Sequence, residues 1–240
     1  MFEVIHEDAD LLAVHKPAGL VCHPTKGDEF SSLISRARLY LKIQQPYLIH
    51  RLDRETSGVV LFAKNPGAAR ELGKIWETRS VQKEYLAIVH GHVPAEHGTI
   101  DAPLGKDESS QVAIKDCVRP DGASAQTEFQ VIKHFSRLSN SQLLASSFSL
   151  LRLAPRTGRK HQIRIHLAHI GHPIVGDKLY GGDEDLYLAL VEDRLTPIQQ
   201  ERLILSHHAL HAATLKFNWN GRIFCFETPP EANFCDFAMI

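Results

Sequence analysis

An aspartate flanked by two arginines is the first place in this sequence where residue types and spacing could do chemistry. Asp53 lies in the run HRLDRETSG at residues 50–58, between Arg51 and Arg54. A carboxylate held near guanidinium groups stays ionised, because the positive charges lower its pKa. Such a group suits nucleophilic attack or the stabilisation of developing positive charge. A surface loop held by salt bridges explains the run alone just as simply, so this alternative stays open at this point.

A second concentration of possible chemistry is a basic segment in the second half of the chain. No acidic residue lies between Glu128 and Asp177, although the whole chain is nearly neutral, with 27 Lys and Arg against 28 Asp and Glu. Arg159, Lys160 and His161 stand at the start of an expected helix, whose N-terminus also attracts anions. The segment favours contact with a polyanion such as RNA, while a solvated charged face is the simpler alternative. Its cations are Lys133, Arg137, Arg152, Arg156, Arg159, Lys160 and Arg164.

Histidines near the same helix raise the possibility of a zinc site. Their spacing matches neither a metalloprotease helix nor a zinc finger, and no acidic residue lies among them. The cysteines are scattered without a C-x-x-C pair, which is typical of free thiols in a reducing compartment. We therefore expect no metal and no disulfide framework. The residues concerned are His161, His166, His169, His172, Cys22, Cys117, Cys225 and Cys235.

Short strands with irregularly placed helices must position these side chains. Asn65 followed by Pro66 is typical of a helix start, and Asn220-Gly221 of a tight hairpin. Strands are expected at residues 2–6, 11–14, 59–63, 83–89, 126–134, 143–153, 209–217 and 222–226, and helices at 31–40, 65–78, 161–170 and 196–205. Because no regular strand–helix alternation occurs, this pattern predicts an α+β fold with a mixed, mainly antiparallel sheet and flanking helices. We expect one catalytic domain over residues 1–240, with residues 105–122 as a surface excursion.

Composition excludes several other classes of protein. Hydrophobic residues make up 43% of the 240 residues and charged residues 23%, which is globular and excludes a disordered, collagen-like or coiled-coil chain. The N-terminus lacks the basic and apolar regions of a signal peptide, and no apolar run is long enough to span a membrane. We therefore expect a soluble cytoplasmic protein that does not contact membranes.

The two chemical segments together resemble the RluA family of RNA pseudouridine synthases. The family signature H-R-L-D-x-x-T-S-G is complete at residues 50–58, and G-R-x-H-Q-[LI]-R-x-H is complete at residues 158–166. A K-x-Y strand motif at 83–85 and the opening K-P-x-G motif within residues 15–19 also match, and GHPIVGD at 171–177 is family-like. The resemblance covers essentially the whole chain. The first expected hairpin begins at residue 2, so we expect a member without the N-terminal S4 domain that many relatives carry.

This resemblance implies an isomerase that cleaves the N-glycosidic bond of a uridine, turns the base and rejoins it through carbon. Asp53 matches the catalytic aspartate of the family, and Arg164 the arginine that pairs with it. Tyr85 matches the tyrosine that stacks on the target base and helps to remove its C5 proton. Arg51 matches the residue that fills the helix stack after the uridine has flipped out. No cofactor or metal is implied, and attack of Asp53 on the ribose or on the base stays open.

The implied partner is structured RNA, either an rRNA or a tRNA stem-loop, bound by a monomer. We expect RNA contacts from Arg51, Arg54, Arg159, Lys160 and His161. A non-catalytic RNA-binding or folding factor is the alternative, but binding alone does not require Asp53, Tyr85 and Arg164 together. A zinc hydrolase built on the histidines at 161–172 is a third hypothesis. The identity of the RNA and of the uridine stays open.

Overall fold

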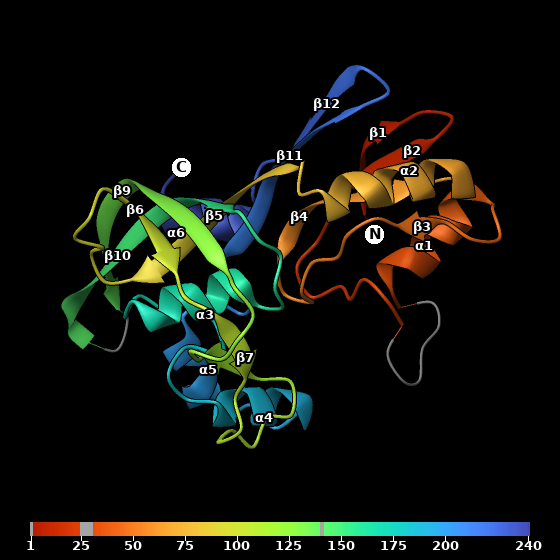
Figure 1. Cartoon of the computed structure of the whole chain (residues 1–240). Helices are drawn as coiled ribbons and strands as arrows, with labels where there is room; N and C mark the ends of the chain where they lie inside the picture. The colour runs from red at the N-terminus through yellow and green to blue at the C-terminus, as the bar shows by residue number, and fades with distance from the viewer. Residues whose placement is uncertain (1, 25–30, 140–141) are drawn as a thin grey trace. The chain divides into compact units, whose positions relative to one another are not determined.

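The computed structural model describes residues 2–24, 31–139 and 142–240 (Figure 1). The chain forms two compact units. Unit 1 comprises Met1–Tyr85 and His211–Ala232, and unit 2 comprises Leu86–Leu210 and Asn233–Ile240. The expectation of one catalytic domain concerns how the two units act together, and it stays a prediction.

Unit 1 contains a mixed sheet built around one completely buried strand, β4 (Ser57–Ala63). A strand with this apolar sequence, SGVVLFA, is expected to be covered on both faces. The pairing β4–β11 is parallel, whereas the pairings β1–β2, β2–β4, β3–β4 and β11–β12 are antiparallel. The partner strands are β1 (Glu3–Glu7), β2 (Leu11–Lys16), β3 (Tyr47–Leu48), β11 (Leu210–Trp219) and β12 (Arg222–Glu227).

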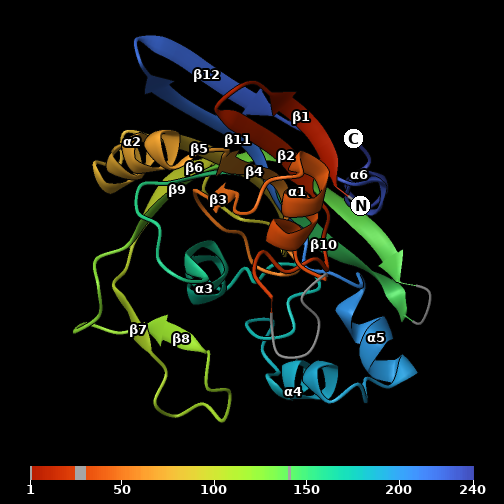
Figure 2. The same cartoon turned by 90° about the vertical axis from the view of Figure 1, so that its right-hand side faces the viewer.

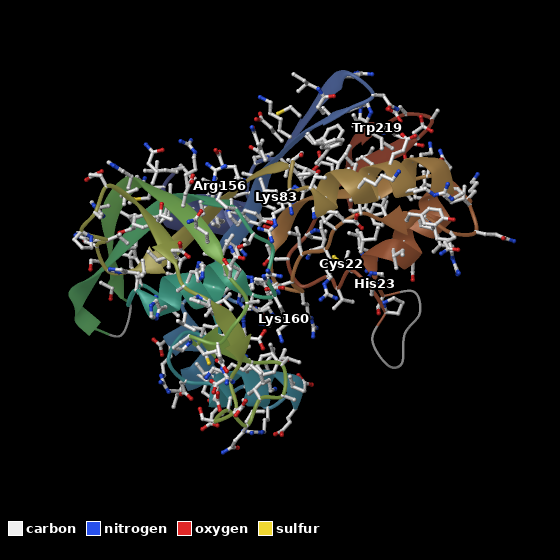
Figure 3. All side chains as sticks on the ribbon, viewed as in Figure 1. Cys22, His23, Lys83, Arg156, Lys160 and Trp219 are labelled. Carbon is white, nitrogen blue, oxygen red and sulfur yellow. The ribbon has the colours of Figure 1, made fainter. Side chains whose placement is uncertain are left out.

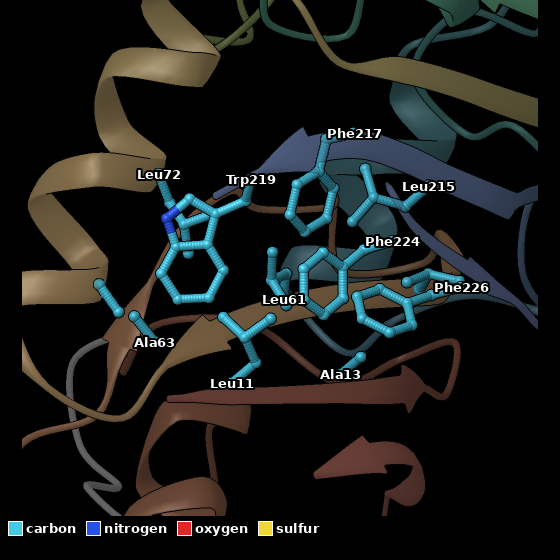
Figure 4. Close-up of a cluster of buried hydrophobic side chains, with 12 residues drawn as sticks. Leu11, Ala13, Leu61, Ala63, Leu72, Leu215, Phe217, Trp219, Phe224 and Phe226 are labelled. Carbon is cyan, nitrogen blue, oxygen red and sulfur yellow. The ribbon is translucent and has the colours of Figure 1, made fainter. Parts of the chain in front are cut away.

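Two helices cover opposite faces of this sheet, because side chains alternate along its strands. Val59, Leu61 and Ala63 of β4 pack in the cluster that includes α2 (Pro66–Glu77). Figure 4 shows this cluster, in which Leu72 of α2 joins Leu11 of β2 and aromatic rings of β11 and β12. Val60 and Phe62 point the other way, into the cluster that includes Leu33 and Ala37 of α1 (Leu33–Leu41).

Unit 2 contains a sheet in the order β5, β10, β9, β6, in which the pairs β10–β9 and β9–β6 are antiparallel. Strand β5 also carries residues of unit 1. A separate two-stranded sheet, β7 with β8, lies near α3 in Figure 2. The elements are β5 (Gln82–His90), β6 (His97–Asp101), β7 (Leu104–Lys106), β8 (Asp116–Val118), β9 (Gln126–Ser139), β10 (Gln142–Pro155), α3 (Gln162–His169), α4 (Asp185–Val191), α5 (Pro197–Leu203) and α6 (Ala232–Ala238), the last spanning the unit boundary.

The predicted fold class is confirmed, and so are most of the predicted elements. Asn65 caps α2 by accepting a hydrogen bond from Ala68 N, and Asn220-Gly221 forms the β11–β12 turn with both φ angles positive. The helix predicted from residue 31 begins at Leu33 and is capped by Ser32. The elements missed were β3, β6, β7, β8, α4 and α6, each of at most seven residues, which is too short for a clear periodic signal.

The excursion at residues 105–122 is not wholly on the surface, which corrects the expectation. Val112 is only 3% exposed and packs with Ile165 of α3 and with Leu179. Val112, together with partly buried Val118, therefore anchors this largely polar segment to unit 2. Within the described residues, the helices are too short or too polar to span a membrane.

Candidate active site

Asp53 lies in the loop that enters β4, and its backbone is held by a local turn. Thr56 N donates to Asp53 O at 3.2 Å. The Asp53 side chain is partly exposed, while Arg51 and Arg54 on either side are exposed. Arg54 Nε donates to Gly19 O at 3.2 Å, so this arginine already links the loop to the segment after β2.

A fully buried lysine ties the two loops together next to Asp53. Lys16, the last residue of β2, donates from Nζ to the carbonyl oxygens of Pro17, Leu20 and Arg54 at 2.9, 2.8 and 3.0 Å. Burial lowers the pKa of Lys16 to about 8, although the negative charge of Asp53 acts in the opposite direction. Lys16 thus fixes the backbone of Arg54, the residue that follows Asp53. The sequence analysis assigned no role to this lysine.

Cys22 fixes the residue that precedes Asp53. Leu52 N donates to Cys22 Sγ, and Sγ donates to Leu52 O, both at 3.4 Å. Burial raises the pKa of this thiol, so it stays protonated and can donate. Lys16 and Cys22 therefore hold the backbone on both sides of Asp53.

A buried hydrogen-bond network holds the start of β4. His211 Nε2 lies 2.9 Å from Thr228 O, which can only accept, so Nε2 carries the proton. Nδ1 therefore accepts from the Ser57 hydroxyl at 2.9 Å. Burial lowers the pKa of His211 to about 4, which keeps the ring neutral near pH 7. Next to Ser57, Gly58 has φ +119°, and a Cβ there would lie 2.2 Å from Ala212 O, so only glycine fits.

Tyr85, the last residue of β5 in unit 1, lies within electrostatic reach of Asp53. It packs against the buried cluster that contains Leu52 and Ala212. Burial raises the pKa of the Tyr85 phenol, and the charge of Asp53 raises it further. Unit 1 thus brings together two of the three predicted catalytic residues.

Arg164, the third predicted catalytic residue, lies in unit 2 and grips a buried aspartate. Its Nε and Nη2 donate to the two carboxylate oxygens of Asp177 at 2.7 and 2.9 Å. Burial alone would raise the pKa of Asp177, but the Arg164 guanidinium holds it well below its usual value. Asp177 also accepts from Leu179 N and Tyr180 N, and the guanidinium lies over the Tyr180 ring at 5.0 Å. The proposed pairing of Arg164 with Asp53 joins residues of different units and stays a prediction.

The residues expected to contact phosphates have partners within unit 2. Lys160 pairs with Asp116 at 2.9 Å, Arg159 Nε donates to Ser124 O at 3.1 Å, and His161 Nδ1 lies 2.9 Å from the Tyr180 hydroxyl. Elsewhere in the basic segment, Arg156 pairs with Glu128, while Lys133 and Arg137 donate to backbone carbonyls at the end of the chain. Figure 3 labels Arg156 and Lys160 on unit 2. The RNA contacts of Arg159, Lys160 and His161, like those of Arg51 and Arg54, stay predictions.

Three of the four histidines that raised the zinc hypothesis, His161, His166 and His172, serve structural hydrogen bonds. His166 is fully buried between Thr127 Oγ1 and Ala102 O, and His172 Nδ1 contacts His90 O. In the described parts of the chain, no three histidine, cysteine or acidic side chains gather as metal ligands. The four cysteines are free thiols.

Lys16→Met tests the buried anchor through stability. Methionine fills a similar volume but donates no proton, so three carbonyl groups lose their donor. We expect the free energy of unfolding at neutral pH to fall by about 1–3 kcal/mol, as measured by denaturant unfolding. Lys216, an exposed lysine on β11, provides the control, because Lys216→Met should change this free energy by less than about 0.5 kcal/mol.

The pH dependence of the same variant tests the lowered pKa of Lys16. Between about pH 8 and the ordinary lysine pKa, the unfolded chain binds a proton at Lys16 that the folded chain has released. The free energy of unfolding of the wild type should therefore rise over this interval relative to that of Lys16→Met. A difference between the two proteins that stays constant with pH would contradict this protonation change.

Comparison with known proteins identifies the family. The family model for RNA pseudouridylate synthases matches residues 10–169. The dual-specificity RNA pseudouridine synthase RluA of Vibrio vulnificus is 40% identical over 218 residues, covering 90% of this chain and 77% of the relative. The ribosomal large subunit pseudouridine synthase D of Haemophilus ducreyi is 31% identical over 239 residues, covering 97% and 68% respectively. The solved structure of human RNA pseudouridylate synthase domain containing 1 matches with 25% identity and a TM-score of 0.75, covering 96% of this chain and 84% of that one.

Fold and sequence together define an isomerase of the RNA pseudouridine synthase class. Within that class, the chain belongs to the RluA family, which confirms the resemblance carried by its motifs.

Proposed function

We propose that this chain converts specific uridines in structured RNA to pseudouridine, with Asp53 as the reacting carboxylate. The observation that carries the proposal is the position of Asp53 between two residues fixed by Cys22 and Lys16, within electrostatic reach of Tyr85. An ionised carboxylate held in one place suits a centre that becomes electrophilic during the reaction. Its partner in this proposal is Arg164, which keeps Asp53 charged and in one orientation.

The reaction balances within the substrate. The bond from ribose C1′ to N1 breaks, the base turns, a bond from C1′ to C5 forms, the C5 proton leaves and N1 gains a proton. Asp53 supports this exchange by adding to the ribose or to the base. We assign to Tyr85 stacking on the target base. Its raised pKa keeps the phenol protonated at neutral pH, so Tyr85 can accept the C5 proton only as it passes its own proton onward.

The target uridine has to leave its helix to reach Asp53, because a stacked and paired base is inaccessible. We propose that exposed Arg51 occupies the vacated place in the stack, and that Arg54 contacts the RNA backbone beside it. The two units act together as one catalytic domain in this proposal, as a monomer in the cytoplasm. The proposed substrates are stem-loops of rRNA or tRNA, and one relative carries the ribosomal large subunit in its name.

Release of tritium from RNA made with [5-³H]uridine tests the proposal, because pseudouridine formation frees the C5 hydrogen. Purified protein is incubated with unmodified tRNA and large-subunit rRNA transcripts. We expect tritium release that stops at a small whole number of sites per transcript. Tight RNA binding without any release would instead support the RNA-binding or folding factor and contradict the proposed reaction.

Neutralising Arg159 and Lys160 tests whether unit 2 contacts phosphates. Arg159→Gln with Lys160→Gln should weaken binding to different RNAs alike, because phosphate contacts carry no sequence information. The slope of log affinity against log salt should become shallower by about one per lost contact. Lys160 has to exchange Asp116 for phosphate when RNA binds. An unchanged salt slope in this double variant would mean that both side chains serve only their partners in unit 2. Lys216→Gln provides the control and should leave the salt slope of the wild type unchanged.

A further inference from the structure

Among the described residues of unit 1, no anion pairs with one half-buried cation. Lys83 lies on β5, two residues before Tyr85, and is labelled in Figure 3. Its Nζ lies over the Trp76 ring, 5.8 Å from the ring centroid. Within the described parts of the chain, the Lys83 side chain has neither a hydrogen bond nor an ion pair. Burial lowers the pKa of its ammonium group.

The groups around Lys83 are aromatic or neutral. Trp76 stacks on His50, with ring centroids 5.7 Å apart and an interplanar angle of 18°. His50 Nε2 accepts a hydrogen bond from Leu61 N at 3.3 Å. Burial, together with the charge of Lys83, lowers the pKa of His50 to about 3, so the imidazole is neutral. An aromatic face attracts an ammonium group but does not neutralise it.

This environment differs from that of the other buried cations. Lys16 and Lys178 give their protons to backbone carbonyls, and Arg164 is paired with Asp177. A partly desolvated charge without such partners is unfavourable until an anion supplies the missing interaction. Trp76 meanwhile limits where the ammonium group can lie. Lys83 is therefore held ready for an anion that comes from outside the chain.

The position of Lys83 indicates which anion this is. His50, on which its charge acts, opens the loop that carries Asp53, and Tyr85 follows two residues later on the same strand. In an enzyme that acts on RNA, the anions nearest the reacting base are the phosphodiesters on either side of it.

We propose that Lys83 binds a backbone phosphate next to the target uridine and so positions the nucleotide on which Tyr85 stacks. This inference rests on the proposed function and adds to it a binding residue for one phosphate. Lys83 is a contact to substrate in this account and does not take part in the bond changes.

Lys83→Met removes the charge and keeps a flexible apolar side chain over Trp76. Binding is measured with one stem-loop RNA that the wild type binds, chosen before any turnover is scored. We expect affinity to fall about 5- to 20-fold near physiological salt, with a salt slope shallower by about one. KM should rise by a similar factor, while kcat changes by less than about threefold. Lys83→Arg should keep the salt slope of the wild type, and the exposed-site control Lys216→Met should leave slope and affinity unchanged.

A single uncharged methylphosphonate linkage, placed in turn at each phosphate around the uridine, identifies the partner of Lys83. At the contacted phosphate, this linkage should lower the RNA affinity of the wild type 5- to 20-fold. It should have almost no effect on the affinity of Lys83→Met, because that variant has already lost the contact with this phosphate. Equal losses of RNA affinity in both proteins at every linkage would overturn the proposal. A Lys83→Met protein with the RNA affinity and salt slope of the wild type would overturn it too. If Lys83→Met does not fold, Lys83→Gln takes its place with the same outcomes.

The two proposals can fail separately. Absence of tritium release from every RNA, with binding intact, would remove the proposed reaction. Normal release by the wild type, combined with unchanged binding by Lys83→Met, would remove only the phosphate contact.

Discussion

Asp53→Asn should abolish pseudouridine formation while RNA affinity stays within about threefold of the wild type. Asparagine has the same shape and can occupy the loop fixed by Cys22 and Lys16, but it carries no charge and is not a nucleophile. Because a reacting group is lost and no phosphate contact changes, the whole effect should fall on turnover. Tritium release measures turnover, and filter binding on the same RNA measures affinity.

An exposed carboxylate in unit 2 provides the matched control for this change. Asp185→Asn removes one negative charge on α4 and should leave both measurements unchanged. Measurable turnover by Asp53→Asn would remove Asp53 from the catalytic role. A large loss of RNA affinity would mean that the loop has moved.

Arg164→Lys should lower turnover by at least about 100-fold, although the positive charge is retained. A guanidinium has five N–H donors in a fixed plane, and the contact with Asp177 uses two of them. In our account, Arg164 also holds Asp53, so one planar group has to serve two carboxylates. Lysine cannot reproduce that geometry, and a misplaced reacting group costs about two orders of magnitude in rate. Single-turnover kinetics measure the loss.

The kinetics of Arg164→Lys test the pairing with Asp53 only in a protein that still folds. Denaturant unfolding has to accompany the kinetics, since Arg164→Lys also weakens the buried contact with Asp177. Near-normal turnover by a folded Arg164→Lys protein would refute the pairing. An RNA complex in which Arg164 points away from Asp53 would refute it too.

Local signals explain why most of the fold was predictable. Asn65-Pro66 starts a helix and Asn220-Gly221 turns a hairpin by short-range chemistry, and the buried strand β4 is apolar throughout. The short elements β7 and β8 have three residues each, so no period can develop in them.

The residues that support Asp53 could not be found in this way. Cys22 contacts Leu52 across 30 positions, and Ser57 contacts His211 across 154. Only the pairing of strands brings such residues together. The spacing of a single cysteine or histidine along the sequence does not predict contacts of this kind. Lys16 stood inside a recognised motif, but its burial and its three carbonyl partners required the structure.

The basic segment shows the limit of charge counting along a chain. The run free of acids suggested an open positive surface, yet Arg156 pairs with Glu128, Lys160 with Asp116 and Arg164 with Asp177. These acids lie at or beyond the two ends of the run. Because they are distant in sequence from the arginines and the lysine, the sequence did not indicate that they neutralise these positive charges. By contrast, the Lys83 side chain, in a part of the chain with ordinary charge balance, has neither a hydrogen bond nor an ion pair among the described residues and lies over the Trp76 ring.

Pseudouridine mapping of total RNA from cells with and without this protein tests the central claim most directly. The account predicts that one or a few uridines in stem-loops of rRNA or tRNA lose their modification when the protein is removed. Wild-type protein should restore those positions, and Asp53→Asn protein, expressed at the same level, should not. Identical maps with and without the protein, or full restoration by Asp53→Asn, would contradict it.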